Sequence, residues 1–197
     1  MSEFELVVAT ERMFPLVQHL RYRVYCAEKK FQMPGADHEA RLLTDKADGL
    51  GVTFALFDGA ELVSSAQVIP VDPLTDASGF QVFDLRNALP RPDQGAVIVS
   101  KLVTSRDKRG SKTLGPVMRG ILAFVSEERR RYIAILAEPS MVEFYASMGF
   151  DAVREDLEAA PFGRVTLMVF DMQAEQHVSG KSLAGWMFKS VFANQNH

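Results

Sequence analysis

The spacing of apolar positions along the chain predicts strands alternating with helices. A short strand is expected over residues 3–9, and a helix over about 14–30. The apolar positions of this helix recur every three or four residues: Val17, Leu20 and Val24. After a polar loop, apolar runs at 51–57 and 61–69 flank Asp58-Gly59-Ala60, which predicts two strands joined by a hairpin.

The second half of the chain repeats this alternation around one strongly apolar run. Ala96–Thr104 is almost continuously apolar, as expected of a central strand buried on both faces. A polar turn follows, then a helix of about 113–131 and a strand at 132–137. Pro139 opens a further helix, and Gly149 closes it. The remaining expectations are two strands and one short helix: Phe150–Arg154, Arg164–Asp171 and Asp84–Ala88.

Composition fits a globular α/β protein. The 197 residues, 47% apolar and 24% charged, suffice for one domain with a hydrophobic core. Alternating strands and helices predict helices packed on a mixed sheet. We expect this domain over residues 1–175 and a tail over 176–197 with a short amphipathic helix. Cys26 is the single cysteine and no run fits a signal or a bilayer span, so we expect a cytoplasmic protein without an integral membrane segment.

Charge is spread unevenly, although the net charge is only −3. Residues 101–131 hold nine basic and three acidic side chains, so this segment carries +6 and the rest of the chain −9. A basic segment on an acidic chain favours one anionic ligand over general affinity for nucleic acid. A solvated helix face is the alternative interpretation.

A strand, a basic turn and a helix follow one another over residues 96–131, an order that suits phosphate binding. The helix N-terminus offers unpaired N–H groups and the positive end of its dipole, and Gly110 allows close backbone approach. Basic side chains crowd the same turn: Arg106, Lys108, Arg109 and Lys112. The turn therefore predicts a site for a pyrophosphate or a phosphopantetheine.

The stretch Ala137–Phe150 carries the most specific motif, a Pro followed by Phe-Tyr and then Met-Gly-Phe. Here the chain resembles the GNAT superfamily of N-acyltransferases. The resemblance implies a GNAT-like fold, with a mixed, mostly antiparallel sheet of six to seven strands and helices on both faces. It also implies a splayed central cleft between residues 96–104 and 132–137. Tyr145 matches a tyrosine that protonates the departing thiolate; the alternative is an aromatic side chain packed in the core.

Four further motifs occur in the order and spacing of a narrower group: Arg21-x-x-Val24-Tyr25 with Phe31, Asp45-x-x-Asp48, Gln67-Val68-Ile69-Pro70, and Ile98-Val99-Ser100-Lys101. They resemble the acyl-homoserine-lactone synthases and related N-acyl amino acid synthases. The similarity covers most of residues 15–150, with a small insertion near 32–44. It implies that these positions form the acceptor pocket.

The chain also departs from that group. Gln67 and Lys101 stand where the group has arginine, and Ile98 stands where it has glutamate. Ile98 cannot act as a base or pair with a cation, so transfer to another amine is favoured over homoserine-lactone production. Arg109 and Ser111 replace small residues of the coenzyme A signature. Branches that use acyl carrier protein also depart from this signature, and the acidic surface of the carrier is complementary to the +6 segment.

We therefore expect an N-acyltransferase that moves an acyl group, a fatty one in the leading interpretation, from acyl carrier protein or acyl-coenzyme A to an amine such as an amino acid. A short-chain acetyl-coenzyme A-dependent N-acetyltransferase and a non-catalytic acyl-thioester-binding protein are the alternatives. The thioester is a co-substrate, and neither a bound cofactor nor a metal is expected. The acceptor amine and the acyl length are left open.

The expected site residues form three groups. The catalytic candidates are Tyr145, Asp45 and Asp48, with Glu28 as a further candidate for the general base. The donor-binding residues are Leu102, Val103, Thr104, Arg106, Arg109, Gly110, Ser111 and Lys112. The substrate pocket comprises Arg21, Tyr25, Phe31, Gln67, Ser100 and Lys101. Backbone N–H groups near 102–104 are expected to hold the pantetheine and polarise the thioester carbonyl.

Overall fold

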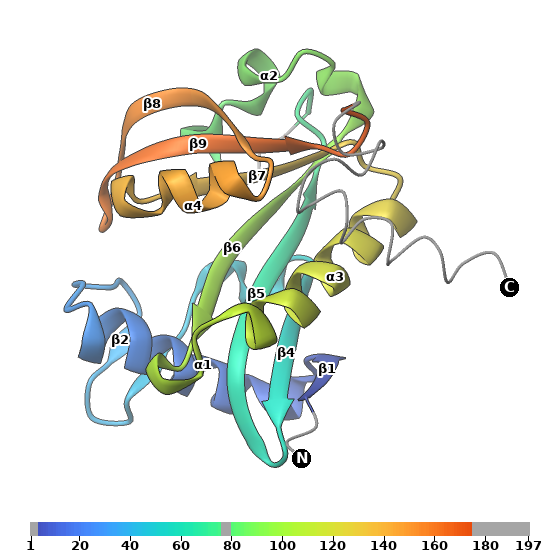
Figure 1. Ribbon diagram of the computed structural model, residues 1–197. Helices are drawn as coiled ribbons and strands as arrows, with labels where there is room; N and C mark the ends of the chain where they lie inside the picture. Colours follow the sequence, from blue (N-terminus) through green and yellow to red (C-terminus); the bar gives the residue numbers. More distant parts are fainter. Residues whose placement is uncertain (1–3, 76–79, 175–197) are drawn as a thin grey trace, which may run out of the picture. The chain divides into compact units, whose positions relative to one another are not determined.

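The computed structural model describes residues 4–75 and 80–174 (Figure 1). Seven strands form one sheet in the order β1-β4-β5-β6-β7-β9-β8. Their bounds are β1 Phe4–Val8, β4 Val52–Asp58, β5 Glu61–Val71, β6 Ala96–Thr104, β7 Tyr132–Ala137, β8 Asp151–Ala159 and β9 Gly163–Asp171. β6 pairs with β7 in parallel, whereas β1–β4, β4–β5, β7–β9 and β8–β9 pair antiparallel. The predicted fold class, a mixed and mostly antiparallel sheet with helices, is confirmed.

Four helical segments matter for the candidate site: α1 (Phe14–Tyr22), the π-helix η2 (Arg23–Glu28), α3 (Ser111–Glu127) and α4 (Val142–Ser147). The expected apolar positions of the first helix are all buried: Val17, Leu20 and Val24. Shorter helices and a two-stranded ribbon fill the connections: η1 Glu11–Met13, β2 Ala36–Asp37, β3 Leu42–Leu43, η3 Lys46–Gly49, η4 Gln81–Phe83, α2 Leu85–Ala88, η5 Pro92–Gln94, η6 Arg106–Lys108 and η7 Pro139–Met141.

The chain divides into two compact units, and each is described by itself. The first unit runs to Ile69 and includes Val99–Ile121, and the second takes Pro70–Ile98 and continues from Leu122. The splayed cleft stays a prediction, as does the single domain over residues 1–175. The helix expected in the C-terminal tail lies outside the described residues.

The first unit is built on the antiparallel strands β1, β4 and β5. β1 pairs with β4 from Phe4↔Asp58 to Val8↔Phe54. β4 and β5 form the predicted hairpin, and Gly59 supplies the left-handed backbone that the turn needs (φ +61°). α3 packs closely on this layer, because a Cβ on Gly120 would lie 2.5 Å from the Leu6 Cδ2.

The second unit is built on β7, β9 and β8. β7 pairs with β9 from Tyr132↔Asp171 to Ala137↔Thr166. The parallel pairing of β6 with β7 joins the first three residues of each strand, ending at Ile98↔Ala134. α4 contacts β8 and β9 and lies against them in Figure 1.

Several elements end elsewhere than the sequence predicts, each for a local reason. The first helix becomes a π-helix at Arg23, and the left-handed Lys30 (φ +61°) follows it. α3 stops at Glu127, before the left-handed Arg129 (φ +53°). β5 continues through Pro70, whose missing N–H lies beyond the last β4 partner, Val52↔Val68.

At Gly51 the loop before β4 lies close against the backbone of β5. The φ of Gly51 is +64°, and an added Cβ would lie 2.1 Å from the Val68 carbonyl oxygen and 2.8 Å from the Ile69 Cα. Backbone cannot move aside as a side chain can, so Gly51→Ala is expected to lower the free energy of unfolding by about 3 kcal/mol. Urea denaturation measures this change.

The matched control is Gly49→Ala, two residues earlier, where an added Cβ meets no atom within 4 Å. We expect its free energy of unfolding to stay within about 0.5 kcal/mol of the wild-type value. Equal effects of the two substitutions would contradict the close fit at Gly51.

Candidate functional site

A fully buried guanidinium lies at the centre of the candidate site. The side chain of Arg21, near the end of α1, has 0% exposure, and its Nη1 donates a hydrogen bond to Oδ1 of Asp48. Its Nε and Nη2 have no hydrogen-bond partner among the described residues. A charge removed from water in this way requires a counter-charge, which Asp48 supplies.

The turn that carries Asp48 is held by a capping box. Oδ1 of Asp45 accepts from the N–H of Ala47 at 2.7 Å, and Oδ2 of Asp48 accepts from the N–H of Asp45 at 3.1 Å. Nε2 of Gln67, on β5, donates to the carbonyls of Ala47 and Leu50, the latter at 3.1 Å. The Asp-x-x-Asp motif therefore shapes the turn through its capping hydrogen bonds, and it also supplies two carboxylates to the site.

Lys101 completes the cluster from β6. Its Nζ donates to Oε1 of Gln67 at 2.5 Å and lies 3.3 Å from Oδ2 of Asp45 and 3.8 Å from Oδ1 of Asp48. Its backbone is left-handed (φ +52°), which is costly for a residue with a Cβ in the middle of a strand. Burial, and then the charge of Arg21, lower the pKa of Lys101, while the two carboxylates oppose that shift.

The two carboxylates are not equivalent. The cluster is balanced, with two cations and two anions, but Asp48 is only 14% exposed and binds Arg21, whereas Asp45 is 39% exposed. Asp45 is therefore the carboxylate that a ligand can reach. It can accept a proton or pair with an ammonium group, while Lys101 beside it can pair with a carboxylate.

Three further expected pocket residues, Tyr25, Phe31 and Ser100, lie outside the charged cluster. The rings of Tyr25 and Phe31 pack with their centroids 6.4 Å apart, and the Phe31 N–H donates to the Tyr25 carbonyl at 2.9 Å. The hydroxyl of Ser100 is buried and has no hydrogen-bond partner in the described part of the chain.

The basic segment is largely neutralised by distant carboxylates. Four of its nine cations form such ion pairs: Lys101–Asp45, Lys108–Asp58, Arg109–Glu28 and Arg131–Asp171. The charge that a partner meets therefore falls from +6 to about +2. Within the described residues, five cations of the segment have no ion pair: Arg106, Lys112, Arg119, Arg129 and Arg130.

The turn between β6 and α3 is braced by hydrogen bonds. The N–H of Ser105 donates to the Val63 carbonyl at 2.8 Å, and the hydroxyl of Thr113 donates to the carbonyls of Lys108 and Gly110 at 2.7 and 3.0 Å. Ser64 of β5 holds the strand before the turn, because its hydroxyl donates to the Val103 carbonyl at 2.9 Å. No sequence signal pointed to Ser64, since its role depends on a strand 39 residues away.

Tyr145 lies on α4, in the second unit. Its ring centroid is 5.3 Å from that of Phe144 and 5.7 Å from that of Phe150, both edge-on. Burial, assisted by the negative charge of Glu138, raises the pKa of Tyr145 to about 12. The phenol therefore keeps its proton at neutral pH and is a weaker acid than an exposed tyrosine.

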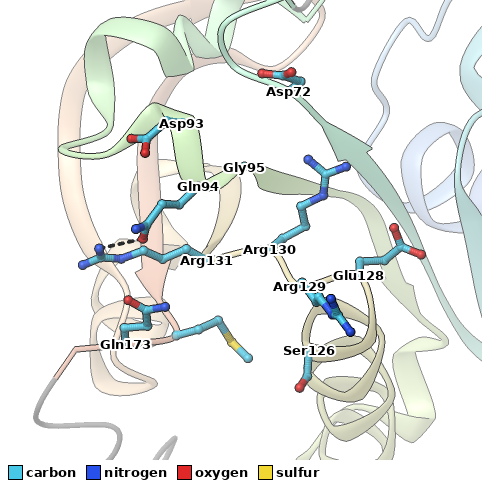
Figure 2. Close-up of a pocket in the computed structure, with 11 residues that line it drawn as sticks. Asp72, Asp93, Gln94, Gly95, Ser126, Glu128, Arg129, Arg130, Arg131 and Gln173 are labelled. Carbon is cyan, nitrogen blue, oxygen red and sulfur yellow. Dashed lines mark hydrogen bonds between the residues drawn. The ribbon is translucent and has the colours of Figure 1, made fainter.

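A pocket of about 560 Å³ lies at the turn between α3 and β7 in the second unit (Figure 2). Its arginines are committed to the fold: Arg131 binds Asp171 in a bidentate pair at 2.7 and 2.9 Å and donates to Gln94 at 2.9 Å. Arg130 donates to the Val71 carbonyl at 3.3 Å. None of the expected site residues lines this pocket.

Comparison with known proteins identifies relatives of the chain. The family profile described as N-acyl amino acid synthase FeeM matches residues 17–171. The structure of FeeM, an N-acyl amino acid synthase from uncultured soil microbes, is similar with a TM-score of 0.70 at 12% identity, over 94% of this chain and 97% of that one. No match to a curated protein sequence was found.

Two acyl-homoserine-lactone (AHL) synthases have similar folds. The AHL synthase LasI gives a TM-score of 0.68 at 11% identity, over 91% of this chain and 95% of that one. The coenzyme A-dependent synthase BjaI, solved with SAM and isopentyl-CoA, gives a TM-score of 0.67 at 14% identity, over 97% of this chain and 90% of that one.

Among the described residues, no helix is long and apolar enough to cross a membrane.

Asp48 and Asp45 differ in a way that stability measurements can show. Asp48→Asn removes the counter-charge of a guanidinium with no exposed surface, so we expect the free energy of unfolding to fall by about 3 kcal/mol. Asp45→Asn keeps an oxygen for the cap and changes a more exposed group, so we expect a loss of about 1 kcal/mol or less. Guanidinium chloride titrations compare the two variants, and a larger loss for Asp45→Asn would refute the assignment.

Proposed function

We propose an acyl donor, an acceptor and catalytic roles for the residues of the site. The proposal proceeds from the family: this chain belongs to the N-acyl amino acid synthase FeeM family and is an N-acyltransferase of the GNAT type. The reaction joins an amine to the acyl group of a thioester. Its acceptor is the amine of an amino acid, and its donor is a fatty acyl thioester of acyl carrier protein or coenzyme A.

The observation that carries the acceptor is the outer side of the charged cluster, where the 39% exposed Asp45 lies beside Lys101, which is 12% exposed. Asp45 and Lys101 lie 3.3 Å apart, a negative group beside a positive one. An amino acid presents the complementary pair, an ammonium and a carboxylate on one carbon. In this proposal Asp45 pairs with the ammonium and Lys101 with the carboxylate. Arg21 and Asp48 fix the cluster from beneath and do not touch the substrate.

Asp45 then acts as the general base. It takes a proton from the ammonium, and the neutral nitrogen attacks the thioester carbonyl carbon to form the C–N bond. The carbonyl oxygen becomes an oxyanion, which backbone N–H groups of Leu102–Thr104 stabilise in the proposal. Support for this role comes from the left-handed Lys101 just before them, since such a residue changes the direction of a strand.

Tyr145 supplies the last proton. The attacking nitrogen still carries a second excess proton, which it loses to water. As the tetrahedral intermediate collapses, the C–S bond breaks and the thiolate leaves with the electron pair. A phenol that is protonated at neutral pH is available to protonate this thiolate, and Tyr145 has that role in the proposal. Both donors occur in the cytoplasm, which accords with the location expected from the sequence.

The function is tested by incubating the purified chain with a pool of amino acids and thioesters of acetyl to palmitoyl length, with mass spectrometry of the products. We expect N-acyl amino acids, with kcat/KM rising about fourfold for each added methylene until the acyl site is filled, since each buried methylene contributes about 0.8 kcal/mol. Asp45→Asn is the control and should lose transfer with every donor. A rate that peaks at acetyl would favour a short-chain N-acetyltransferase instead.

The role of Tyr145 can be tested separately by comparing kcat for thioesters with different leaving groups. Tyr145→Phe is expected to lower kcat about 100-fold with an alkyl thioester, because the thiolate then leaves unprotonated. An aryl thioester, whose thiolate needs no proton, should show a loss of less than about tenfold. Steady-state kinetics with both donors gives this ratio. Equal losses with both donors would assign Tyr145 to packing against Phe150.

A further inference from the structure

The amine of Lys101 is held by the carboxylate that is proposed to bind the acceptor amine. Its Nζ lies 3.3 Å from Oδ2 of Asp45, within the range at which a substrate ammonium group pairs with a carboxylate. Nζ also donates a hydrogen bond to Oε1 of Gln67 at 2.5 Å. The protein therefore supplies an amine of its own beside the proposed general base.

The surroundings of Lys101 favour its neutral, nucleophilic form. Burial, and then the charge of Arg21, lower its pKa, although the two neighbouring carboxylates oppose this shift. A lysine that is desolvated or lies beside another cation is an effective nucleophile. Lys108 shows the opposite case in the same unit, because its hydrogen bond to Asp58 raises the pKa of its amine, which keeps its proton.

The thioester is proposed to bind directly after Lys101 in the chain, with its carbonyl oxygen on N–H groups of Leu102–Thr104. For transfer to occur, the carbonyl carbon must lie within reach of an amine that pairs with Asp45. The amine of Lys101 pairs with Asp45 and meets this condition. A guanidinium at position 101 could form the same ion pair, but it stays protonated and does not attack a thioester.

We propose that Lys101 is an acylation site, whose amine takes the acyl group from the thioester when no amino acid occupies the acceptor site. This inference rests on the proposed function, which supplies the thioester and the base. Nζ gives one proton to Asp45, and its lone pair forms the C–N bond at the carbonyl carbon. The C–S bond then breaks, the thiolate leaves with the electron pair, and the second excess proton of the nitrogen passes through water to the sulfur.

The acylated side chain is an uncharged amide, so it cannot pair with the carboxylate of an amino acid. A bound amino acid prevents the reaction, because its ammonium pairs with Asp45 and its carboxylate pairs with Lys101. Acylation therefore inactivates the chain when thioester is abundant and the acceptor is scarce.

The test incubates the wild-type chain with decanoyl-coenzyme A or decanoyl acyl carrier protein, and peptide mass spectrometry follows each lysine. We expect one decanoyl group on Lys101, formed about 100-fold faster than on Lys108 or on the exposed Lys46. The amino-acid pool of the transfer assay, at about ten times its half-saturating concentration, should slow acylation of Lys101 about tenfold. It should leave the rates at the other two lysines unchanged.

Lys101→Arg is the matched variant, because it keeps the positive charge and removes the amine. Its mass should show no decanoyl group after the time in which the wild-type chain is fully modified, while its circular dichroism spectrum stays that of the wild-type chain. Acylation of Lys101→Arg as fast as that of the wild-type chain would assign the modification to another side chain and overturn the inference.

The outcomes separate the inference from the proposed function. Unmodified Lys101 in a chain that makes N-acyl amino acids, or acylation of Lys101 no faster than that of Lys46, overturns the inference alone. Acylation of Lys101 without any amino-acid product upholds the inference and rejects an amino acid as the acceptor. Failure of both reactions with both thioesters rejects the proposed function, and the inference with it.

Discussion

A guanidinium with no exposed surface determines much of the first unit. Arg21 must have a negative partner inside the protein, and Asp48 meets that demand only if the turn of residues 45–49 is held against α1. Gln67 fixes that turn to β5, and Lys101 links both to β6. One electrostatic requirement therefore sets the relative positions of a helix, a turn and two strands.

This arrangement separates the residues that maintain the site from those available to a substrate. The inner pair, Arg21 and Asp48, has its charge fully committed, whereas Asp45 retains contact with solvent. The turn after β6 shows a related division. Arg109 forms the ion pair with Glu28, while Arg106 acts on the same carboxylate only through its charge.

The apolar pattern predicted the regular elements well, because burial determines both the pattern and the element. The strands Ala96–Thr104 and Tyr132–Ala137 match at both ends. The pattern did not predict elements whose side chains are exposed or whose backbone is irregular: β8 reaches Ala159 with mostly exposed residues, and the π-helix at Arg23 keeps the apolar spacing of an α-helix. Neither feature leaves a trace in the alternation of apolar and polar positions.

The chemistry of the candidate site was predictable only in part. Resemblance to a family selected Asp45 and Asp48 together but could not distinguish them, because the partner of Asp48 is 27 residues away. The count of basic residues overstated the local charge for a similar reason. Arg109 and Glu28 are separated by 81 residues, and only the fold brings them together.

The left-handed backbone at Lys101 has a consequence for how the central strand keeps its shape. Glycine would adopt that conformation without strain, but the chain has a lysine there, held by Gln67, Asp45 and Asp48. The contacts of the ammonium group offset the cost of the backbone. The left-handed turn of the backbone within β6 is therefore held in place by the polar contacts of one charged side chain.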